Sequence, residues 1–383
     1  MGGAEVHGLY VHLPFCARRC HYCDFNTYAG LESLVPAYVE ALKADLDACL
    51  AQGLKAAPGG LRSVYFGGGT PTLLAPEQLA EALAAAAAGF GLASGAEVSV
   101  EANPGTVDAG SLARLRDAGF NRISFGFQAA QDRHLEALGR VHSAEDSIRA
   151  WKAASAAGFT SMSLDLMFGL SGQTRAEWDE SLEWALALNP DHVSFYGLTV
   201  EPGTRFHRLA TEGLLPLPGD EPQAQWYEAG VEVLGAAGLS QYEISNFARE
   251  GKASVHNSLY WRNLDTLGLG AGAWSYLGGE RSGRIRSPQA YIDAVASGRS
   301  PVADSERLEG RAARGEAAML ALRMNEGISL GEWERRTGTE FLGEFGEVLA
   351  PAFRAGCLER VGERVRLTAR GRLVSNEVFA ALL

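Results

Sequence analysis

Short apolar stretches recur along the first two-thirds of the chain, and amphipathic stretches alternate with them. The apolar stretches predict buried strands at residues 8–13, 62–66, 97–101, 122–125, 161–167 and 192–196. Helical spacing of apolar residues predicts helices at 35–50, 76–88 and 109–118. Strands that alternate with helices form a parallel sheet with right-handed crossovers. We therefore predict an α/β fold, and six units rather than eight indicate a partial, open (β/α)6 barrel of the TIM type.

Each predicted strand is followed by glycine, proline or polar residues. One such patch would be no more than a turn, but their recurrence favours a single shared site at the carboxyl ends of the strands. The patch at 67–71 (GGGTP) has neither a phosphate-loop lysine nor the spacing of a dinucleotide fingerprint. Its missing side chains would instead let the backbone approach a ligand ammonium group closely.

Five cysteines are present, and an odd number argues against a disulfide scaffold. Cys49 and Cys357 are isolated and are predicted to be small buried residues. Cys16, Cys20 and Cys23 form a C-x3-C-x2-C loop. Zinc would require a fourth ligand such as His12 or His21, and a ferredoxin-type site would require a fourth cysteine nearby. Alternatively, three thiolates hold a 4Fe–4S cluster with one iron open.

The segment around these cysteines, YVHLPFCARRCHYCDFN, resembles the cluster loop of radical S-adenosylmethionine (SAM) proteins. The resemblance implies that Cys16, Cys20 and Cys23 hold a 4Fe–4S cluster whose open iron binds the amino and carboxylate groups of SAM. It also implies SAM contacts at Tyr10, Tyr22, Gly68, Gly69, Thr70, Glu101, Gln128, Arg140, Asp165 and Thr199.

Three of these residues have chemistry that suits SAM. Arg140 could pair with its carboxylate through two hydrogen bonds. Asp165 lies between Leu164 and Leu166, where an unpartnered charge would be unfavourable, so ribose hydroxyls are reasonable partners. Glu101 ends an apolar strand, and its alternative role is an ion pair with a neighbouring arginine.

The motifs EANPGT, ISFGFQ and LDLMFGL, together with the cluster loop, resemble the oxygen-independent coproporphyrinogen III oxidase superfamily over almost the whole chain. The oxidase branch carries a fourth cysteine two residues after the third, where this chain has Phe25. The heme-chaperone branch has Phe there and an H-N-x-x-Y-W motif, present here at residues 256–261. The resemblance therefore implies a heme chaperone. The alternative is the oxidase, which uses SAM-derived radicals to decarboxylate two propionates to vinyl groups.

The H-N-x-x-Y-W motif has residue types that suit heme. A neutral imidazole is a common axial ligand, so His256 is the leading heme contact, although a lone histidine near aromatic residues is often only structural. Asn257 would orient His256, and Tyr260 and Trp261 would stack on the macrocycle. This chain departs from its relatives at Ser171, where Pro is frequent, and at Trp274, where many have His.

The last part of the chain predicts three helices, a β-ribbon at 358–367 and a final helix, which resembles a small winged-helix unit. Arginine and glutamate are nearly balanced there, which opposes DNA binding and favours a lid or docking surface over the open barrel. We predict three domains: a radical SAM barrel (1–215), a family-specific extension with the heme motif (216–302) and the winged-helix-like lid (303–383).

Charge and hydropathy limit the partners. The formal net charge of −12 argues against nucleic acid as a ligand. No 18-residue apolar run exists, so we expect no stable membrane insertion. The chain start lacks the pattern of a secretion signal, and we expect a cytoplasmic protein. The expected partners are heme and a heme-acceptor protein, with an electron donor as a further candidate; the sequence leaves the oligomeric state open.

Overall fold

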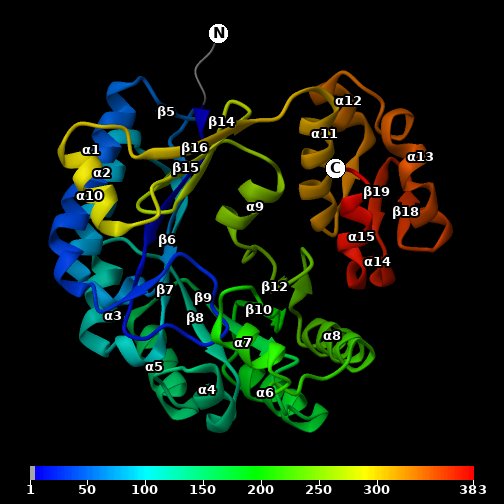
Figure 1. The fold of residues 1–383 in the computed structure, drawn as a ribbon, viewed down its shortest axis with the longest axis horizontal. Coiled ribbons are helices and arrows are strands. Elements are labelled where there is room, and N and C mark those ends of the chain that lie inside the picture. Colours follow the sequence, from blue (N-terminus) through cyan, green and yellow to red (C-terminus); the bar gives the residue numbers. More distant parts are fainter. Residues whose placement is uncertain (1–4) are drawn as a thin grey trace.

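A computed structural model describes residues 5–383 and has one large sheet flanked by helices (Figure 1). The expectation about a secretion signal concerns the chain start, most of which lies outside the described residues. Six strands pair in parallel and in chain order at the centre of the sheet. They are β2 (Gly8–Leu13), β6 (Leu61–Gly68), β7 (Leu92–Ala102), β8 (Arg122–Gln128), β9 (Ser161–Phe168) and β10 (His192–Gly197). The predicted partial barrel is confirmed.

The sheet extends beyond these strands on both sides, which the hydrophobic pattern did not predict. Next to β2 lie the parallel β13 (Thr266–Leu269) and the antiparallel β14 (Trp274–Leu277), β15 (Glu280–Arg284) and β16 (Val302–Arg307). Next to β10 lie the antiparallel β12 (Asn246–Ala248) and β11 (Ser240–Gln241). Since β2 and β10 do not pair, the barrel stays open.

Helices cover the outer face of the sheet (Figure 1). They include α1 (Val35–Ala51), α2 (Pro76–Phe90), α3 (Ala109–Asp117), α4 (Asp132–Leu138), α5 (Ala144–Ala157), α6 (Arg175–Ala187), α7 (Arg205–Thr211), α8 (Asp220–Ala236) and α10 (Pro288–Ala296). Short pieces complete this part: β1 (Glu5–Val6), β3 (Phe15–Cys16), β4 (Tyr28–Ala29), β5 (Lys55–Ala56), and the 3-10 turns Glu32–Leu34, Pro71–Leu73 and Pro104–Thr106. No helix in residues 5–383 is long and apolar enough to cross a membrane.

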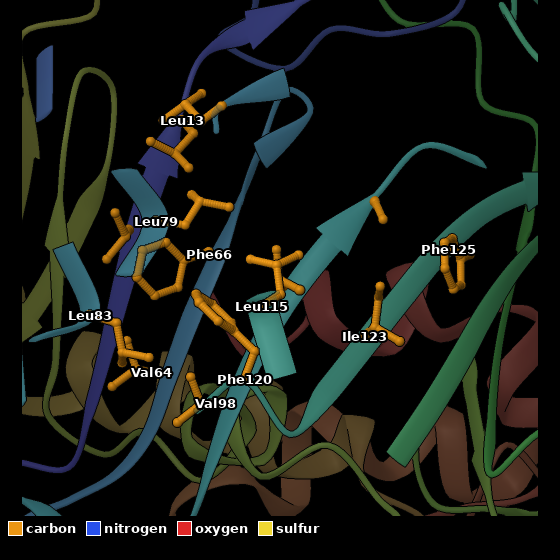
Figure 2. Close-up of a cluster of buried hydrophobic side chains, with 14 of the residues drawn as sticks. Leu13, Val64, Phe66, Leu79, Leu83, Val98, Leu115, Phe120, Ile123 and Phe125 are labelled. Atoms are coloured by element: carbon orange, nitrogen blue, oxygen red, sulfur yellow. The ribbon is translucent and has the colours of Figure 1, made fainter. Parts of the chain in front are cut away.

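The main core lies between the strands and their covering helices. Figure 2 shows Val64, Phe66 and Val98 of the sheet beside Leu83 and Leu115 of the helices, all of them buried. Alternate residues of the same strands are polar, because side chains of a strand point to opposite faces in turn. Their polar atoms meet on the inner side, where the Tyr65 hydroxyl donates to Glu101 Oε1 at 2.7 Å.

The C-terminal part has its own core around Trp333, Phe341 and Phe345. It contains α11 (Gly310–Arg323), α12 (Leu330–Thr337), α13 (Phe341–Arg354), α14 (Ala369–Leu373), α15 (Ser375–Ala380), and a sheet of β17 (Ile328–Ser329), β18 (Leu358–Val361) and β19 (Arg364–Leu367). The winged-helix-like order of elements is confirmed, with two short helices at the end instead of one. The predicted boundary at 303 falls within β16, and the division into three domains stays a prediction.

Candidate cofactor and ligand site

A cavity of about 390 Å³ lies at the carboxyl ends of the central strands, and we call it the cluster cavity. It is lined by the three cysteines of the loop and by nine of the ten residues expected to contact SAM. Those nine are Tyr22, Gly68, Gly69, Thr70, Glu101, Gln128, Arg140, Asp165 and Thr199. The strand ends therefore bring the predicted residues together, as a shared site at one face of a barrel requires.

The cysteine loop is held at its ends by the pairing of β3 with β4. Cys16 is buried, while Cys20 and Cys23 are half-buried. Burial raises the pKa of Cys16 to about 11 and also raises the pKa of Cys23, because a thiolate is poorly solvated there. Arg140 Nη1 lies 3.5 Å from Cys20 Sγ and donates to it. Positive charge is thus needed to keep these sulfurs ionised, and an iron–sulfur cluster would supply it.

The described residues contain no preformed zinc site. Within residues 5–383, no three His, Cys, Asp or Glu side chains are placed to hold a single metal ion. Zinc ligands normally converge on one point at about 2.0–2.3 Å. His12, one of the two proposed fourth ligands, has its Nδ1 at 2.9 Å from the Tyr10 hydroxyl and its Nε2 at 3.0 Å from the Asn26 carbonyl oxygen.

The glycines after β6 allow the chain to pass close to the cysteine loop. Gly68 has φ +117°, and a Cβ there would lie 2.6 Å from the His12 ring. A Cβ on Gly69 would lie 2.5 Å from the Phe15 carbonyl oxygen and 3.0 Å from Cys16 Sγ. Glycine is therefore required at both positions by close approach, and at Gly68 also by backbone conformation.

Glu101 and Asp165 give the cluster cavity two carboxyl groups. Burial raises the pKa of Glu101 to about 7 and that of Asp165 to about 6. The partners of Glu101 are the Tyr65 hydroxyl and the Gly68 N–H, the latter at 3.1 Å, and no arginine of residues 5–383 forms an ion pair with it. The ion-pair alternative for Glu101 is therefore wrong. Both carboxyl groups would ionise more easily beside a cationic ligand.

Gln128 and Arg140 present polar atoms that nothing in residues 5–383 satisfies. A register shift at the end of β8 places Gln128 at φ +64°, which is unusual for a residue with a side chain. Gln128 Oε1 and Arg140 Nε are buried without a hydrogen-bond partner in the described part of the chain. Buried polar atoms normally have partners, so the cavity fits a polar ligand such as SAM.

A second cavity of about 390 Å³ adjoins the first, and we call it the aromatic cavity. Its lining residues are Tyr10, His12, Phe25, Asn26, Gly68, Glu101, Tyr260, Gly272, Ala273 and Trp274. Tyr10, the remaining predicted SAM residue, lies here. Phe25, Gly68 and Glu101 border both cavities. Phe25 is 65% exposed and Trp274 is 50% exposed, so two large apolar side chains flank this cavity in contact with solvent.

The H-N-x-x-Y-W motif lies on α9 (Val255–Trp261), a short helix on the inner side of the sheet (Figure 1). Ser254 caps its first turn, and the Glu97 carboxylate accepts from the backbone N–H groups of Val255 and His256 at 3.0 and 3.1 Å. Negative charge at a helix N-terminus is favourable. The Glu97 side chain, on the inner side of the sheet, therefore fixes the residue at which α9 begins.

The four residues predicted to contact heme are not brought together around one cavity. Tyr260 lines the aromatic cavity, whereas His256 is 1% exposed and burial lowers its pKa to about 3. Asn257 is half-buried beside His256 on α9. Trp261 lies at the far end of the helix, with the Arg323 guanidinium 4.4 Å from its ring centroid. Their roles toward heme stay predictions.

Sequence reasoning missed several residues that line the cavities. In the cluster cavity these include Asn103, Ser124, Met167, Tyr196 and Glu201. Ser124 could have been found from strand alternation, since it lies two residues before Gly126 on the same face of β8. Phe25 was noted only as the residue that distinguishes the two branches, and Trp274 only as a difference from relatives. Their position beside one cavity required the fold.

Comparison with known proteins supports the resemblance. Residues 10–185 match the model of the Radical SAM superfamily, and residues 309–374 match the HemN C-terminal domain. The chain is 39% identical to the "Heme chaperone HemW" of Bacillus subtilis (strain 168), with 98% of each chain covered. It is also 39% identical to the protein of that name from Mycobacterium tuberculosis (strain H37Rv), with 98% of this chain and 94% of the relative covered.

Two further relatives extend the comparison. "Radical S-adenosyl methionine domain-containing protein 1, mitochondrial" of Bos taurus is 38% identical, over 87% of this chain and 76% of its own. Among solved structures, coproporphyrinogen III oxidase (HemN) from Escherichia coli superposes with a TM-score of 0.84 at 24% identity, over 99% of this chain and 90% of that one. At this identity the likeness shows the fold alone.

Proposed function

The chain belongs to the HemW family of radical SAM proteins, and on this premise we propose that it binds heme and passes it to an acceptor protein. The observation that carries the proposal is the aromatic cavity beside the cluster cavity. Exposed apolar side chains grouped at the mouth of a cavity are typical of ligand-binding and interaction sites. Phe25 and Trp274 offer flat apolar surfaces to a planar ligand at the cavity mouth.

The cluster cavity is proposed to hold a 4Fe–4S cluster and SAM. Cys16, Cys20 and Cys23 would be the iron ligands, and bound SAM would add a redox-sensitive sulfonium beside the cluster. Arg140 would receive the SAM carboxylate through its Nε, which has no hydrogen-bond partner within residues 5–383. Glu101 and Asp165 would meet the ammonium and ribose groups, and Gln128 would donate to or accept from a further polar atom.

Phe25 separates this proposal from the oxidase alternative. In the oxidase branch the corresponding position carries a fourth cysteine, whereas here an apolar ring stands between the two cavities. The complete set of SAM residues is compatible with decarboxylation of coproporphyrinogen III, so the enzyme stays the alternative. An acceptor protein, an electron donor and a cytoplasmic location belong to the proposal as predictions.

The test compares heme transfer with decarboxylation in the anaerobically reconstituted full chain. Heme-loaded protein is mixed with an apo heme protein, and we expect the spectrum of the acceptor to appear. With coproporphyrinogen III, SAM and a reductant, we expect no vinyl product. Cys20→Ala should lose the cluster spectrum, whereas the control Cys357→Ala, in the separate C-terminal core, should keep it. Decarboxylation without heme transfer would reject the chaperone function.

A further inference from the structure

The wall of the aromatic cavity offers no cation to a ligand. Among residues 5–383, no lysine or arginine lines this cavity, and the Glu101 carboxyl group lies where it borders the cluster cavity. A ligand carboxylate that entered the cavity would therefore lose its hydration without gaining an opposite charge, which is unfavourable. A flat apolar ligand that carries carboxylates is better accommodated with its apolar part inside and its carboxylates at the mouth.

Arg286 lies at this mouth and is held against the end of the cysteine loop. Its carbonyl oxygen accepts from Asn26 Nδ2 at 2.9 Å and from the Tyr28 hydroxyl at 3.2 Å. Asn26 lines the aromatic cavity, and the Arg286 Nε donates to Asn26 Oδ1 at 3.4 Å. The guanidinium is thus in contact with the cavity wall, beside the residue that follows the exposed Phe25 in the sequence.

Asn26 also connects Arg286 with the turn that precedes Trp274. Its Nδ2 donates to the Ala271 carbonyl oxygen at 2.9 Å. The Gly272 N–H, in the same turn, donates to the carbonyl oxygen of Ile285 at 3.0 Å. The segments that carry the guanidinium and the Phe25 and Trp274 rings are therefore joined around one amide side chain.

Arg286 has no carboxylate partner within residues 5–383, unlike the arginines of the two strands beside it. Those arginines each form an ion pair: Arg281 with Glu316, Arg284 with Asp45 and Arg307 with Glu280. Arg286 is exposed, and the hydrogen bond to Asn26 engages only its Nε. A guanidinium has five N–H donors in a planar fork, so the two terminal nitrogens are available to a ligand.

Building on the proposed function, we propose that Arg286 binds a carboxylate of the ligand at the mouth of the aromatic cavity. The apolar ring system would then lie against Phe25 and Trp274, with its carboxylate edge toward solvent. A guanidinium and a carboxylate are matched for two parallel hydrogen bonds, which fix orientation as well as contribute affinity. The ligand class is a flat tetrapyrrole with carboxylate side chains, and Arg286 acts whichever group binds the iron.

Arg18 is the competing cation. It is exposed in the cysteine loop and lines the cluster cavity with Cys16 and Cys20, but it does not line the aromatic cavity. A ligand carboxylate bound by Arg18 would occupy the space proposed for SAM. The experiment must therefore separate Arg18 from Arg286.

The test measures the affinity of the anaerobically reconstituted full chain for heme and for heme dimethyl ester, whose carboxylates are methylated and uncharged. We expect the native protein to prefer heme, and Arg286→Ala to bind heme about 3- to 10-fold more weakly with its affinity for the ester unchanged. Arg286→Lys should recover part of the loss, because lysine supplies the charge without the planar fork. The matched control is Arg354→Ala, which removes an exposed arginine of the C-terminal part and should change neither affinity.

The outcomes separate this inference from the proposed function. If the native protein binds neither ligand, the proposed function fails. Equal affinity for both ligands, or an equal loss of both in Arg286→Ala, overturns this inference alone. A preference for heme that Arg286→Ala retains also overturns it, whether or not Arg18→Ala loses that preference. The hydrogen bonds of the Arg286 carbonyl group are backbone contacts that every variant keeps, and the cluster absorbance of each variant reports whether the cysteine loop is intact.

Discussion

Single residues at the strand ends decide the electrostatics of the cluster cavity. Glu101 and Asp165 are held in surroundings that disfavour their charged forms, and the Arg140 Nε has no partner within residues 5–383. A ligand that carries a carboxylate together with a net positive charge would satisfy all three groups at once. The types of these residues, and the positions of Glu101 and Asp165 on strands, were predictable from the sequence. The hydrogen bond of the buried His256 was not predictable, because its partner Ser63 lies 193 residues away in the chain.

The pKa of Glu101 predicts how the ligand-free protein responds to pH. Because the folded-state pKa, about 7, lies above the usual 4.5, folding favours the protonated form. Stability therefore falls as pH rises from about 4.5 to 7, and the loss is complete above that range. Glu101→Gln should raise the free energy of unfolding at about pH 8 by up to about 3 kcal/mol and have little effect near pH 4.

Thermal unfolding of both proteins without SAM, at the two pH values, measures this difference. Calorimetric titration should show weaker SAM binding by Glu101→Gln, while heme binding persists. A variant less stable than the native protein at the higher pH would contradict the assigned environment of Glu101. Loss of both ligands in a folded variant would show that the two cavities do not act as separate sites.

The close approach of Gly69 to the cysteine loop predicts a second effect. Gly69→Ala would push its Cβ against the Phe15 carbonyl and Cys16 Sγ, so the loop must move. We expect less iron bound per chain after reconstitution, measured by iron analysis and by absorbance. Gly235→Ala on α8, where a Cβ meets nothing within 4 Å, is the control and should retain full iron. Equal iron in both variants would contradict the account.

Among the elements, α9 connects the barrel interior with the aromatic cavity and the C-terminal part. The sequence predicted the six central strands, since each is an apolar run before a glycine or polar patch. It did not predict β13, because Thr266–Leu269 is only four residues long and contains a glycine. Its strand state comes from pairing with β2, more than 250 residues away in sequence, which no local pattern reports.

The dependence of α9 on Glu97 can be tested by substitution. Glu97→Ala leaves the first N–H groups of α9 without an acceptor and removes the carboxylate 3.9 Å from the buried Arg122. We expect a loss of about 1–3 kcal/mol in the free energy of unfolding, by urea denaturation, and weaker heme binding with SAM binding kept. The control is Glu250→Ala, which changes an exposed glutamate in the segment before α9. Unchanged heme affinity would show that α9 does not position the heme site.

At the scale of the whole molecule, the C-terminal part is anchored to the barrel through Arg323. Its guanidinium lies over the Trp261 ring and 3.7 Å from the fully buried Glu243 carboxylate. Asn325 Nδ2 donates to the Gln241 carbonyl at 2.7 Å beside it. The predicted winged-helix order was readable from the sequence, whereas this attachment depends on residues that only the fold brings together.

Arg323→Ala should destabilise the protein by about 1–3 kcal/mol, because Glu243 loses its opposite charge in a buried setting. Glu243→Gln in the same chain should recover part of that loss, since no buried charge is then left unpaired. Urea denaturation of the native protein, both single variants and the double variant gives the coupling free energy between the two side chains. A coupling of zero would mean that Arg323 acts through Trp261 alone.

Two adjoining cavities of one chain are proposed to hold SAM and heme together. An equilibrium heme titration of the anaerobically reconstituted protein, followed by the Soret band with and without saturating SAM, tests this proposal most directly. We expect saturation near one heme per chain in both conditions, with SAM remaining bound. Absence of saturable heme binding, or displacement of SAM by heme, would contradict it.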